Sequence, residues 1–486
     1  MPRHPRPVQP QALPDAAIDV IAAHPHSGVL VRQRHTRKSH HMQTDLSVPE
    51  QADVVRRLFW RLMPFVTAIY LIAIIDRQNV GFAKLQMVDH LGMTETVYGL
   101  ASSLFFIGYL LLEVPSVLAQ NRFGARIWLA RILGSWGLVT IALGFTQTGT
   151  MFGALRFLLG VAEAGAYPGL VFYLTLWFPL AYRVRALAVL TLGSSLGNAL
   201  GAFIGGPLLE LDGTFGLHGW QWVFLATGVP AVAMMFVVLR WLPDTPKTAS
   251  FLNDRERGWL LRTLADESGA KQSGHGSFLS ALISPRVLFL AGVYTLIMIS
   301  LYGVIYWTPT VVREFGVTGT MNGVLSATPW LVTTALLLWL PKRLEGVRRS
   351  RIGMMVFASI GLLAFGCSTL VADNTLRFIA IVIGTPCISL LIPCFWPMPS
   401  RILSGARAAG GIAIISTIGS IGGFIAQNLM PWVAGLGGAP VYAMLVPAFC
   451  LGALAVGSSV ALVRDGTATA DTTPENLPST SGSPSG

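Results

Sequence analysis

Residues 156–179 read RFLLGVAEAGAYPGLVFYLTLWFP, an apolar stretch that contains an arginine and a glutamate. Arg156 and Glu163 are seven positions apart. At about 3.6 residues per turn, both side chains fall on one face of a helix, roughly 10 Å apart along its axis. A charge near the centre of a bilayer costs at least ~2.5–3.5 kcal/mol unless it faces a partner or a wet cavity. The stretch therefore predicts a water-lined path through a membrane protein, with Glu163 as a proton carrier.

The composition of the whole chain agrees with a protein that crosses the membrane many times. Of its 486 residues, 53% are hydrophobic and 12% are charged, and the mean hydropathy is +0.60. Soluble domains carry about 25% charged residues. A dozen spans of about 20 residues each would use roughly half of the chain.

The net charge of +11 does not indicate a nucleic-acid partner, because the arginines lie between apolar segments and form no continuous basic face. The four cysteines all fall inside apolar stretches without a C-x-x-C pair, so we interpret them as small buried hydrophobic residues. We expect no metal and no cofactor. The predicted partners are a small organic anion, a proton and the lipid bilayer, and we expect the protein to act as a monomer.

The chain divides into five regions. Residues 1–61 and 464–486 are predicted to be disordered tails, the first of them basic and cytoplasmic. Two six-helix bundles are predicted over 62–241 and 286–463, with a cytoplasmic loop over 242–285 between them. Twelve apolar segments are predicted near 62–83, 98–119, 127–146, 150–177, 186–209, 221–241, 286–309, 321–341, 352–371, 376–399, 408–430 and 438–463.

Lysine and arginine gather in every second connection, which predicts that both termini are cytoplasmic. The basic connections contain Arg122 and Arg126, Arg183 and Arg185, Lys247 to Lys271, Lys342 to Arg351, and Arg401 and Arg407. The other connections contain little beyond Lys84, Arg313 and Arg377. The resulting fold class is an all-α membrane protein of twelve transmembrane helices.

The two halves repeat in sequence. RALAVLTLGSSLGNALGAF starts at Arg185, and RAAGGIAIISTIGSIGGFI starts at Arg407, so that a constant offset of 222 pairs several polar and glycine positions. A repeat of this kind is expected when two bundles face each other across a central cavity. The glycines allow close helix packing, and Asn198, Ser416 and Ser420 are predicted to line the cavity.

Several segments resemble the anion:cation symporter family of the major facilitator superfamily. They include DRQNVGFAKLQM (76–87), RFLLGVAEAGAYPGL (156–170) and FWPMPSRILSGARAAGGIAIISTIGSIGGFI (395–425). The resemblance extends in order from about residue 60 to residue 460, and bacterial members for tartrate, hydroxyphenylacetate, phthalate and sugar acids are the most similar. It implies proton-coupled import of a small organic anion by alternating access across the bacterial inner membrane. The acidic residue of the family's first span matches Asp76, and the Arg and Glu of its fourth span match Arg156 and Glu163.

The residues themselves give roles that agree with this resemblance. Neighbours on a helix point about 100° apart, so Asp76 and Arg77 cannot face the same spot. We expect Arg77 to face the cavity and attract an anion, and Asp76 to titrate beside a cation. The alternative is an ion pair that only fixes the first span. Arg156 is expected to bind a substrate carboxylate bidentately. The alternative for Glu163 is an ion pair that serves packing alone.

The C-terminal half contains almost no charge within its spans and offers aromatic and hydroxyl groups instead. Tyr302 and Tyr306 are four residues apart and share a helix face. Together with Trp396, Ser416 and Ser420 they are predicted to form an uncharged side of the cavity that suits a hydroxylated or aromatic acid. For Tyr306, a position at the lipid interface is the alternative.

No enzyme signature is found, because the sequence lacks GxxxxGK[ST], HExxH and a nucleophile elbow. Two other functions remain open at this point. One is a membrane sensor of the same anion that signals through its long N-terminal tail. The other is an exporter or exchanger of the same fold.

Overall fold

Every regular element in the described part of the chain is a helix. The computed structural model describes residues 46–269, 284–340, 343, 346–402 and 406–470. Eleven helical segments are long and apolar enough to cross a membrane, with α5 and α6 counted as one segment. The 32-residue α16 (Ala406–Gly437) supplies the twelfth. The predicted all-α fold of twelve membrane helices is therefore confirmed.

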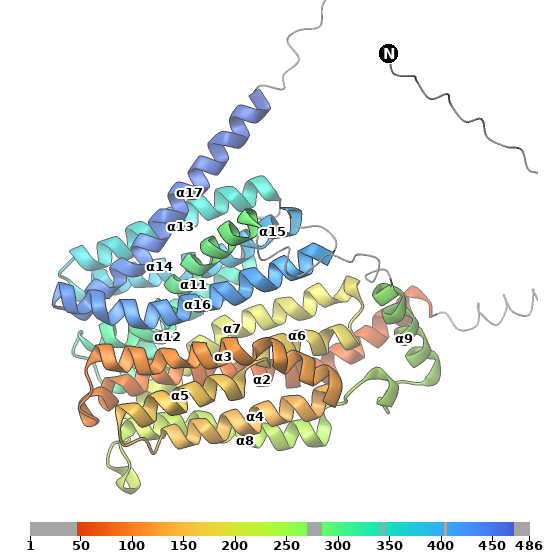
Figure 1. The fold of residues 1–486 in the computed structure, drawn as a ribbon, viewed down its shortest axis with the longest axis horizontal. Helices are drawn as coiled ribbons and strands as arrows, with labels where there is room; N and C mark the ends of the chain where they lie inside the picture. Colours follow the sequence, from red (N-terminus) through yellow and green to blue (C-terminus); the bar gives the residue numbers. More distant parts are fainter. Residues whose placement is uncertain (1–45, 270–283, 341–342, 344–345, 403–405, 471–486) are drawn as a thin grey trace, which may run out of the picture.

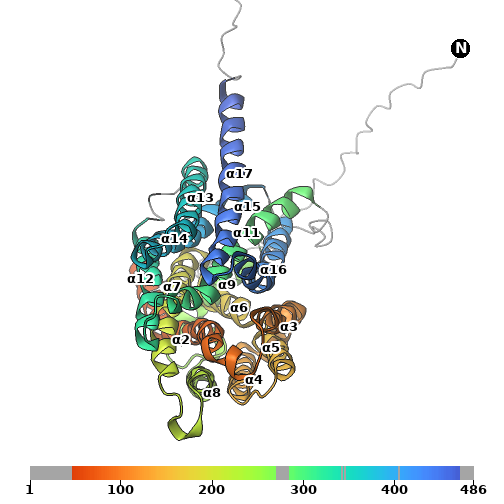
Figure 2. The same ribbon diagram turned by 90° about the vertical axis from the view of Figure 1, so that its left-hand side faces the viewer.

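The helices form two bundles that follow each other in the chain and lie one above the other in Figure 1. The N-terminal bundle contains α2 (Val48–His90), α3 (Glu95–Phe123), α4 (Ala125–Leu143), α5 (Gly149–Glu163), α6 (Ala166–Trp177), α7 (Leu180–Leu209) and α8 (Gly219–Trp241). The C-terminal bundle contains α11 (Pro285–Arg313), α12 (Gly319–Trp339), α13 (Val347–Leu370), α14 (Asn374–Phe395), α15 (Pro397–Ile402), α16 and α17 (Leu445–Ala470). Figure 2 views the bundles along their helices.

Capping side chains start several spans on the periplasmic side, where the basic loops are absent. The hydroxyls of Thr94, Thr148 and Thr318 accept hydrogen bonds from the third backbone N–H of α3, α5 and α12. The carboxylate of Asp373 does the same for α14. These contacts satisfy N–H groups that have no partner within the helix.

The repeat seen in the sequence has a structural counterpart. α7 packs along α2, where Gly197 and Gly201 face Ile74 and Gln78 so closely that a Cβ would collide with them. α16 packs along α11 in the same way, with Gly419 against Tyr294. The glycines allow these helix pairs to approach each other closely.

The fourth span is broken in its middle, a feature that the prediction of one helix over 150–177 missed. α5 ends at Glu163, and α6 begins at Ala166. Between them, Gly165 has a φ of +83°, and a Cβ there would collide with the hydroxyl of Ser116. Only glycine fits this combination of backbone angle and close contact. Pro168 follows in the first turn of α6, where its missing N–H breaks no helical bond.

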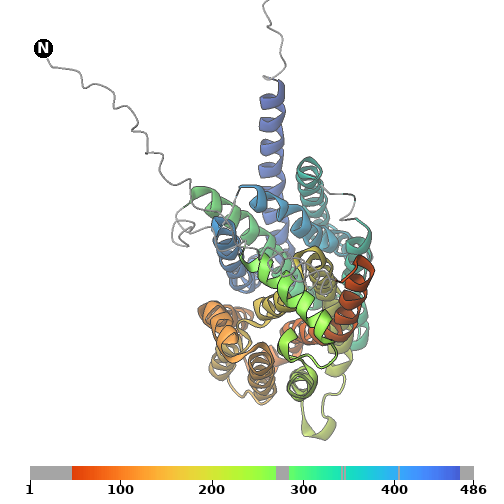
Figure 3. The same ribbon diagram turned by 90° about the vertical axis from the view of Figure 1, so that its right-hand side faces the viewer.

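Both predicted tails are shorter than the sequence indicated. α2 already begins at Val48 and α17 continues to Ala470, so residues 48–61 and 464–470 are helical. Residues 1–45 and 471–486 of these tails lie outside the described residues. The first turns of α2 contact the cytoplasmic helix α9 (Asp254–Gly269), where Arg57 pairs with Glu256. Glu267, in the last turn of α9, accepts a hydrogen bond of 2.7 Å from the first backbone N–H of α7. α9 therefore belongs to the cytoplasmic end of the N-terminal bundle (Figure 3).

The two bundles are joined near their periplasmic ends. Glu210, which follows α7, accepts hydrogen bonds of 2.7 Å from the backbone N–H and 2.9 Å from the hydroxyl of Thr320 in α12. Lys84 of α2 lies 3.3 Å from the ring centroid of Trp307 in α11. Gly206 of α7 packs directly against the backbone of Gly319 and Gly323. These contacts hold the two bundles together at this end of the molecule.

Close packing of α3 on α5 generates our first prediction. A Cβ on Gly160 would collide with the carbonyl oxygen of Phe105, whereas a Cβ on Gly366 would meet nothing within 4 Å. Alanine is favoured over glycine in a helix by about 1 kcal/mol, but overpacking costs about 1–3 kcal/mol. We expect Gly160→Ala to lower the thermal unfolding temperature of the detergent-purified protein. The matched control Gly366→Ala should keep or raise it, and equal unfolding temperatures for the two variants would contradict the packing described.

The Glu210 contact generates a second prediction, about pH. The hydrogen bonds from the backbone and side chain of Thr320 lower the pKa of the Glu210 carboxyl below its ordinary value of 4.5. Because the folded-state pKa is lowered, the stabilisation is present above pH 4.5 and is lost as the pH falls through the folded-state value. Glu210→Ala should therefore lower the unfolding temperature at pH 7, and the difference from the parent protein should shrink below about pH 4.5. Asp53→Ala, which removes an exposed carboxylate at the cytoplasmic end, serves as the control. A difference that does not change with pH would refute this role.

Candidate functional site

An ion pair between the first and fourth spans lies at the centre of the candidate site. Arg77 of α2 donates from Nε and Nη2 to Oε1 of Glu163 in α5, at 2.9 and 2.6 Å. The Glu163 side chain is 0% exposed, and the Arg77 side chain is 18% exposed. The second carboxylate oxygen of Glu163 is buried and has no hydrogen-bond partner among the described residues. The pair therefore occupies two N–H donors of Arg77 but only one of the two carboxylate oxygens of Glu163.

Aromatic residues of both bundles surround Arg77. Its guanidinium carbon lies 5.6 Å from the ring centroid of Phe105 and 5.3 Å from that of Tyr109, both in α3. Its Nη1 lies 3.4 Å from the hydroxyl of Tyr302 in α11. Rings at these distances favour a cation through their quadrupole. Arg77 is thus held by the N-terminal bundle and also contacts the C-terminal bundle.

Arg156 lies beside this pair without joining it. The expectation that Arg156 and Glu163 share one face of a helix is consistent with the structure, but the ion-pair partner of Glu163 is Arg77. Arg156 is 2% exposed and donates from Nε to the carbonyl oxygen of Ser102, at 3.2 Å. Its guanidinium carbon lies 4.8 Å from the ring centroid of Phe105. Among the described residues, the ion-pair partner of Glu163 thus comes from the first span, and Arg156 is held by a backbone carbonyl of α3.

Asp76 points away from Arg77, as the 100° rule requires. It is 1% exposed, and its carboxylate accepts hydrogen bonds from three neutral donors. These donors are Trp136 Nε1 at 2.9 Å, Thr140 Oγ1 at 3.2 Å and Asn79 Nδ2 at 3.0 Å. Asp76 also lies within electrostatic range of Glu163 and Arg156. Two carboxylates and two guanidinium groups thus form one charged cluster inside the N-terminal bundle.

The break in the fourth span lies directly after Glu163. It leaves carbonyl groups of the last turn of α5 without helical partners, and Arg131 of α4 donates from Nη1 to one of them, Ala162, at 3.4 Å. Neither this break nor the contact of Arg131 was predicted from the sequence. The AGAYPG segment contained the signal, because a glycine followed three residues later by proline is typical of a helix end and a new helix start.

The other predicted site residues fall into two groups. Tyr302 and Tyr306 stack with ring centroids 5.9 Å apart, and both line a cavity between the bundles. Tyr306 is 7% exposed, so the alternative of a lipid interface does not apply to it. The other four residues are not among those that line this cavity, and they contact residues of the same or an adjacent helix. Asn198 accepts from Gln78, Trp396 packs on Tyr294 and Phe395, and Ser420 donates to the Ser416 carbonyl.

Gln427, which also lines this cavity, was not predicted. Gln427 of α16 contacts the hydroxyl of Ser102 in α3 across the bundle interface. A repeat alignment does not mark Gln427, because its position lies beyond the matched segment. Its amide group within an apolar helix was the available signal, since a buried amide needs partners.

Comparisons with known proteins agree with this architecture. Residues 66–427 match the family model of the Major Facilitator Superfamily. The chain is 38% identical to a putative tartrate transporter of Agrobacterium vitis, over 90% of this chain and 98% of that protein. It is also 38% identical to a quinolone resistance transporter of Acinetobacter baumannii, over 77% of this chain and 87% of that protein.

A solved structure shares the fold. The crystal structure of the D-xylose-proton symporter superposes with a TM-score of 0.62 at 14% sequence identity, over 82% of this chain and 96% of that one. The family model matches most of the chain, and the described helices form the two bundles of this fold. The protein therefore belongs to the Major Facilitator Superfamily and is a multi-pass transporter of the inner membrane.

Proposed function

We propose that the protein imports a small organic anion together with protons by alternating access. The substrate is an acid of the tartrate, sugar-acid or aromatic-carboxylate type. The ion pair of Arg77 and Glu163 carries the proposal, because it joins a guanidinium that can bind an anion to a buried carboxylate that can take up a proton. The name of the Agrobacterium vitis relative, a putative tartrate transporter, supports an organic acid as the substrate.

Proton binding and anion binding are linked through Arg77. In the ion pair, Nε and Nη2 of Arg77 are both occupied by Glu163. A proton on Glu163 removes its charge and weakens this hold, so that the same two N–H groups become available to a substrate carboxylate. Arginine binds carboxylates with two parallel hydrogen bonds. The proton and the substrate therefore favour each other on the site.

The charge of the cluster supports the same coupling. Asp76, Arg77, Arg156 and Glu163 together carry no net charge when all are ionised. A bound carboxylate adds one negative charge, which is costly in the membrane interior, and a proton on Glu163 restores neutrality. Asp76 provides a second position for a proton when the substrate carries two carboxylates. Arg156, whose Nε is held by Ser102, is the second cation for the substrate.

The periplasmic contacts between the bundles suit alternating access. Glu210, Lys84 and the paired glycines join residues that must separate before substrate can enter from the periplasm. The Arg77 contact to Tyr302 connects the charged cluster to the C-terminal bundle. When Arg77 exchanges Glu163 for substrate, this connection changes with it, which links the occupancy of the site to the movement of the bundles.

A glutamine at position 163 tests the coupling. Glu163→Gln resembles the protonated acid and leaves Arg77 free, so counterflow of labelled tartrate in proteoliposomes should remain. A pH gradient of one unit supplies about 1.4 kcal/mol per proton, or tenfold accumulation. The variant should lose this accumulation, so that the ratio of internal to external tartrate concentration reaches about 1.

The control is Glu314→Gln, which makes the same substitution at an exposed residue outside the cluster. It should keep both counterflow and accumulation. If Glu163→Gln accumulates the acid as well as the parent protein does, Glu163 is not the proton carrier. If the parent protein catalyses counterflow but does not accumulate the acid in response to a pH gradient, the protein is not a proton symporter.

A further inference from the structure

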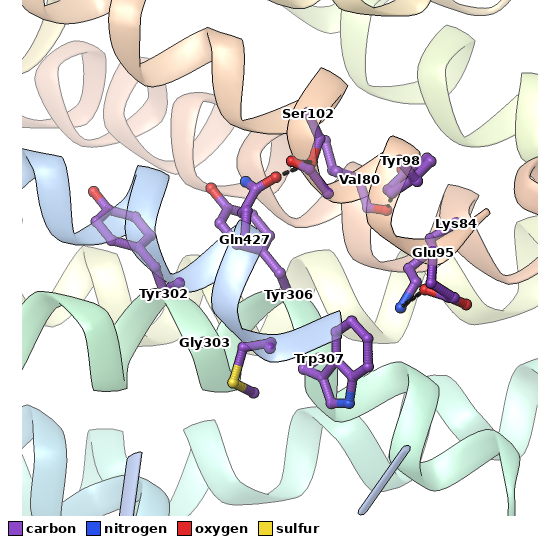
Figure 4. A pocket seen from close by; sticks show the side chains of 13 residues that line it. Val80, Lys84, Glu95, Tyr98, Ser102, Tyr302, Gly303, Tyr306, Trp307 and Gln427 are labelled. Atoms are coloured by element: carbon purple, nitrogen blue, oxygen red, sulfur yellow. Dashed lines mark hydrogen bonds and ion pairs between the residues drawn. The ribbon is translucent and has the colours of Figure 1, made fainter. Parts of the chain in front are cut away.

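A narrow cavity between the bundles contains two polar groups that lack partners. α2, α3, α11 and α16 enclose it, and Figure 4 shows Tyr306 and Gln427 on its walls. The Tyr306 hydroxyl and the Gln427 Nε2 are buried without a hydrogen bond in the described part of the chain. The two residues are 7% and 6% exposed. A buried polar group without a partner costs about 1–3 kcal/mol, so a polar group that enters the cavity and pairs with these atoms is favoured.

The hydrogen bond between Ser102 and Gln427 does not remove this need. The Ser102 hydroxyl has one proton and two nearby acceptors, the Gly99 carbonyl at 3.1 Å and the Gln427 amide. If the proton goes to Gly99, the amide turns and offers Nε2 to the hydroxyl, which leaves Oε1 free. If it goes to Gln427, Nε2 is free. Either way, one amide atom lacks a partner, and a hydroxyl group satisfies both cases because it donates and accepts.

The size and charge of the cavity also suit a hydroxyl group. Its free space is about 20 Å³, which holds about one water-sized group. The charged residues on its wall are Lys84 and Glu95, which pair with each other at 2.5 Å. A second carboxylate would therefore meet a neutralised lysine and too little room. A hydroxyl group fits without bringing charge.

The cavity adjoins the proposed anion site. Ser102 contacts Gln427 with its hydroxyl and Arg156 Nε with its carbonyl oxygen. Tyr302 lines the cavity and lies 3.4 Å from Arg77 Nη1. Both arginines are within electrostatic range of Tyr306. An acid bound by these arginines thus places the atoms next to its carboxylate close to Tyr306 and Gln427.

We infer that Tyr306 and Gln427 form a subsite for a hydroxyl group of the transported acid, so that the substrate class is a hydroxy acid. The inference rests on the proposed transport of an organic anion and narrows its substrate. A site built to hydrogen-bond a hydroxyl group strongly rejects the analogue that lacks it, because its own polar groups then stay unpaired.

The test compares acids that differ only in hydroxyl groups. Titration calorimetry measures the affinity of the purified full-length protein for three pairs of acids. The pairs are tartrate and succinate, 4-hydroxyphenylacetate and phenylacetate, and gluconate and hexanoate. We expect at least one hydroxylated acid to bind at least about tenfold more tightly than its partner. In Tyr306→Phe and Gln427→Leu this ratio should fall toward about 1. Affinity for the acid without hydroxyl groups should remain, which also shows that the variants are folded.

Tyr98→Phe is the matched control. Tyr98 lines the same cavity, but its hydroxyl already donates to the Val80 carbonyl at 2.8 Å. The ratio should therefore stay as in the parent protein. If acids bind but the two members bind equally in every pair, or if the ratio survives in Tyr306→Phe and Gln427→Leu, the subsite is refuted while anion transport stands. If no acid binds, the proposed function fails and the subsite with it.

Discussion

The arrangement of the N-terminal bundle depends on one interaction, the ion pair of Arg77 and Glu163 inside the membrane. Separated charges there would each cost several kcal/mol, and a direct hydrogen-bonded pair offsets part of this cost. The pair uses two N–H groups of Arg77 and one oxygen of Glu163, and it leaves the other oxygen buried without a partner. A site that holds its arginine firmly and its carboxylate incompletely is suited to exchange a proton for an anion.

The scaffold around this pair explains its position. The close crossing of α3 and α5 at Gly160 brings Phe105 and Tyr109 of α3 next to Arg77. The helix break at Gly165 ends α5 directly after Glu163, so the carboxylate lies at a helix terminus and not in the middle of a regular span. Packing of α7 on α2 fixes the helix that carries Arg77. The Major Facilitator fold thus supplies rigid neighbours for a few charged groups.

Much of the fold was predictable from the sequence, but the pairing within the site was not. Hydropathy and the positions of lysine and arginine gave twelve helices, and the repeat of the two glycine-rich segments matches the packing of α7 on α2 and of α16 on α11. Helix periodicity placed Arg156 and Glu163 on one face, but it contains no information about a residue 86 positions away on another span. The partner of Glu163 therefore emerged only from the structure. Gln427 was missed for the same reason, since its contact with Ser102 joins the two bundles.

The central claim is that an organic acid and protons cross the membrane together. Its most direct measurement uses purified protein in sealed proteoliposomes that contain a pH-sensitive dye and begin with equal pH on both sides. An inward gradient of tartrate, or of the hydroxy acid that binds best, is then imposed while labelled acid and internal pH are recorded together. The account predicts internal acidification in constant proportion to the acid that enters. Entry of the acid with no change of internal pH would contradict it.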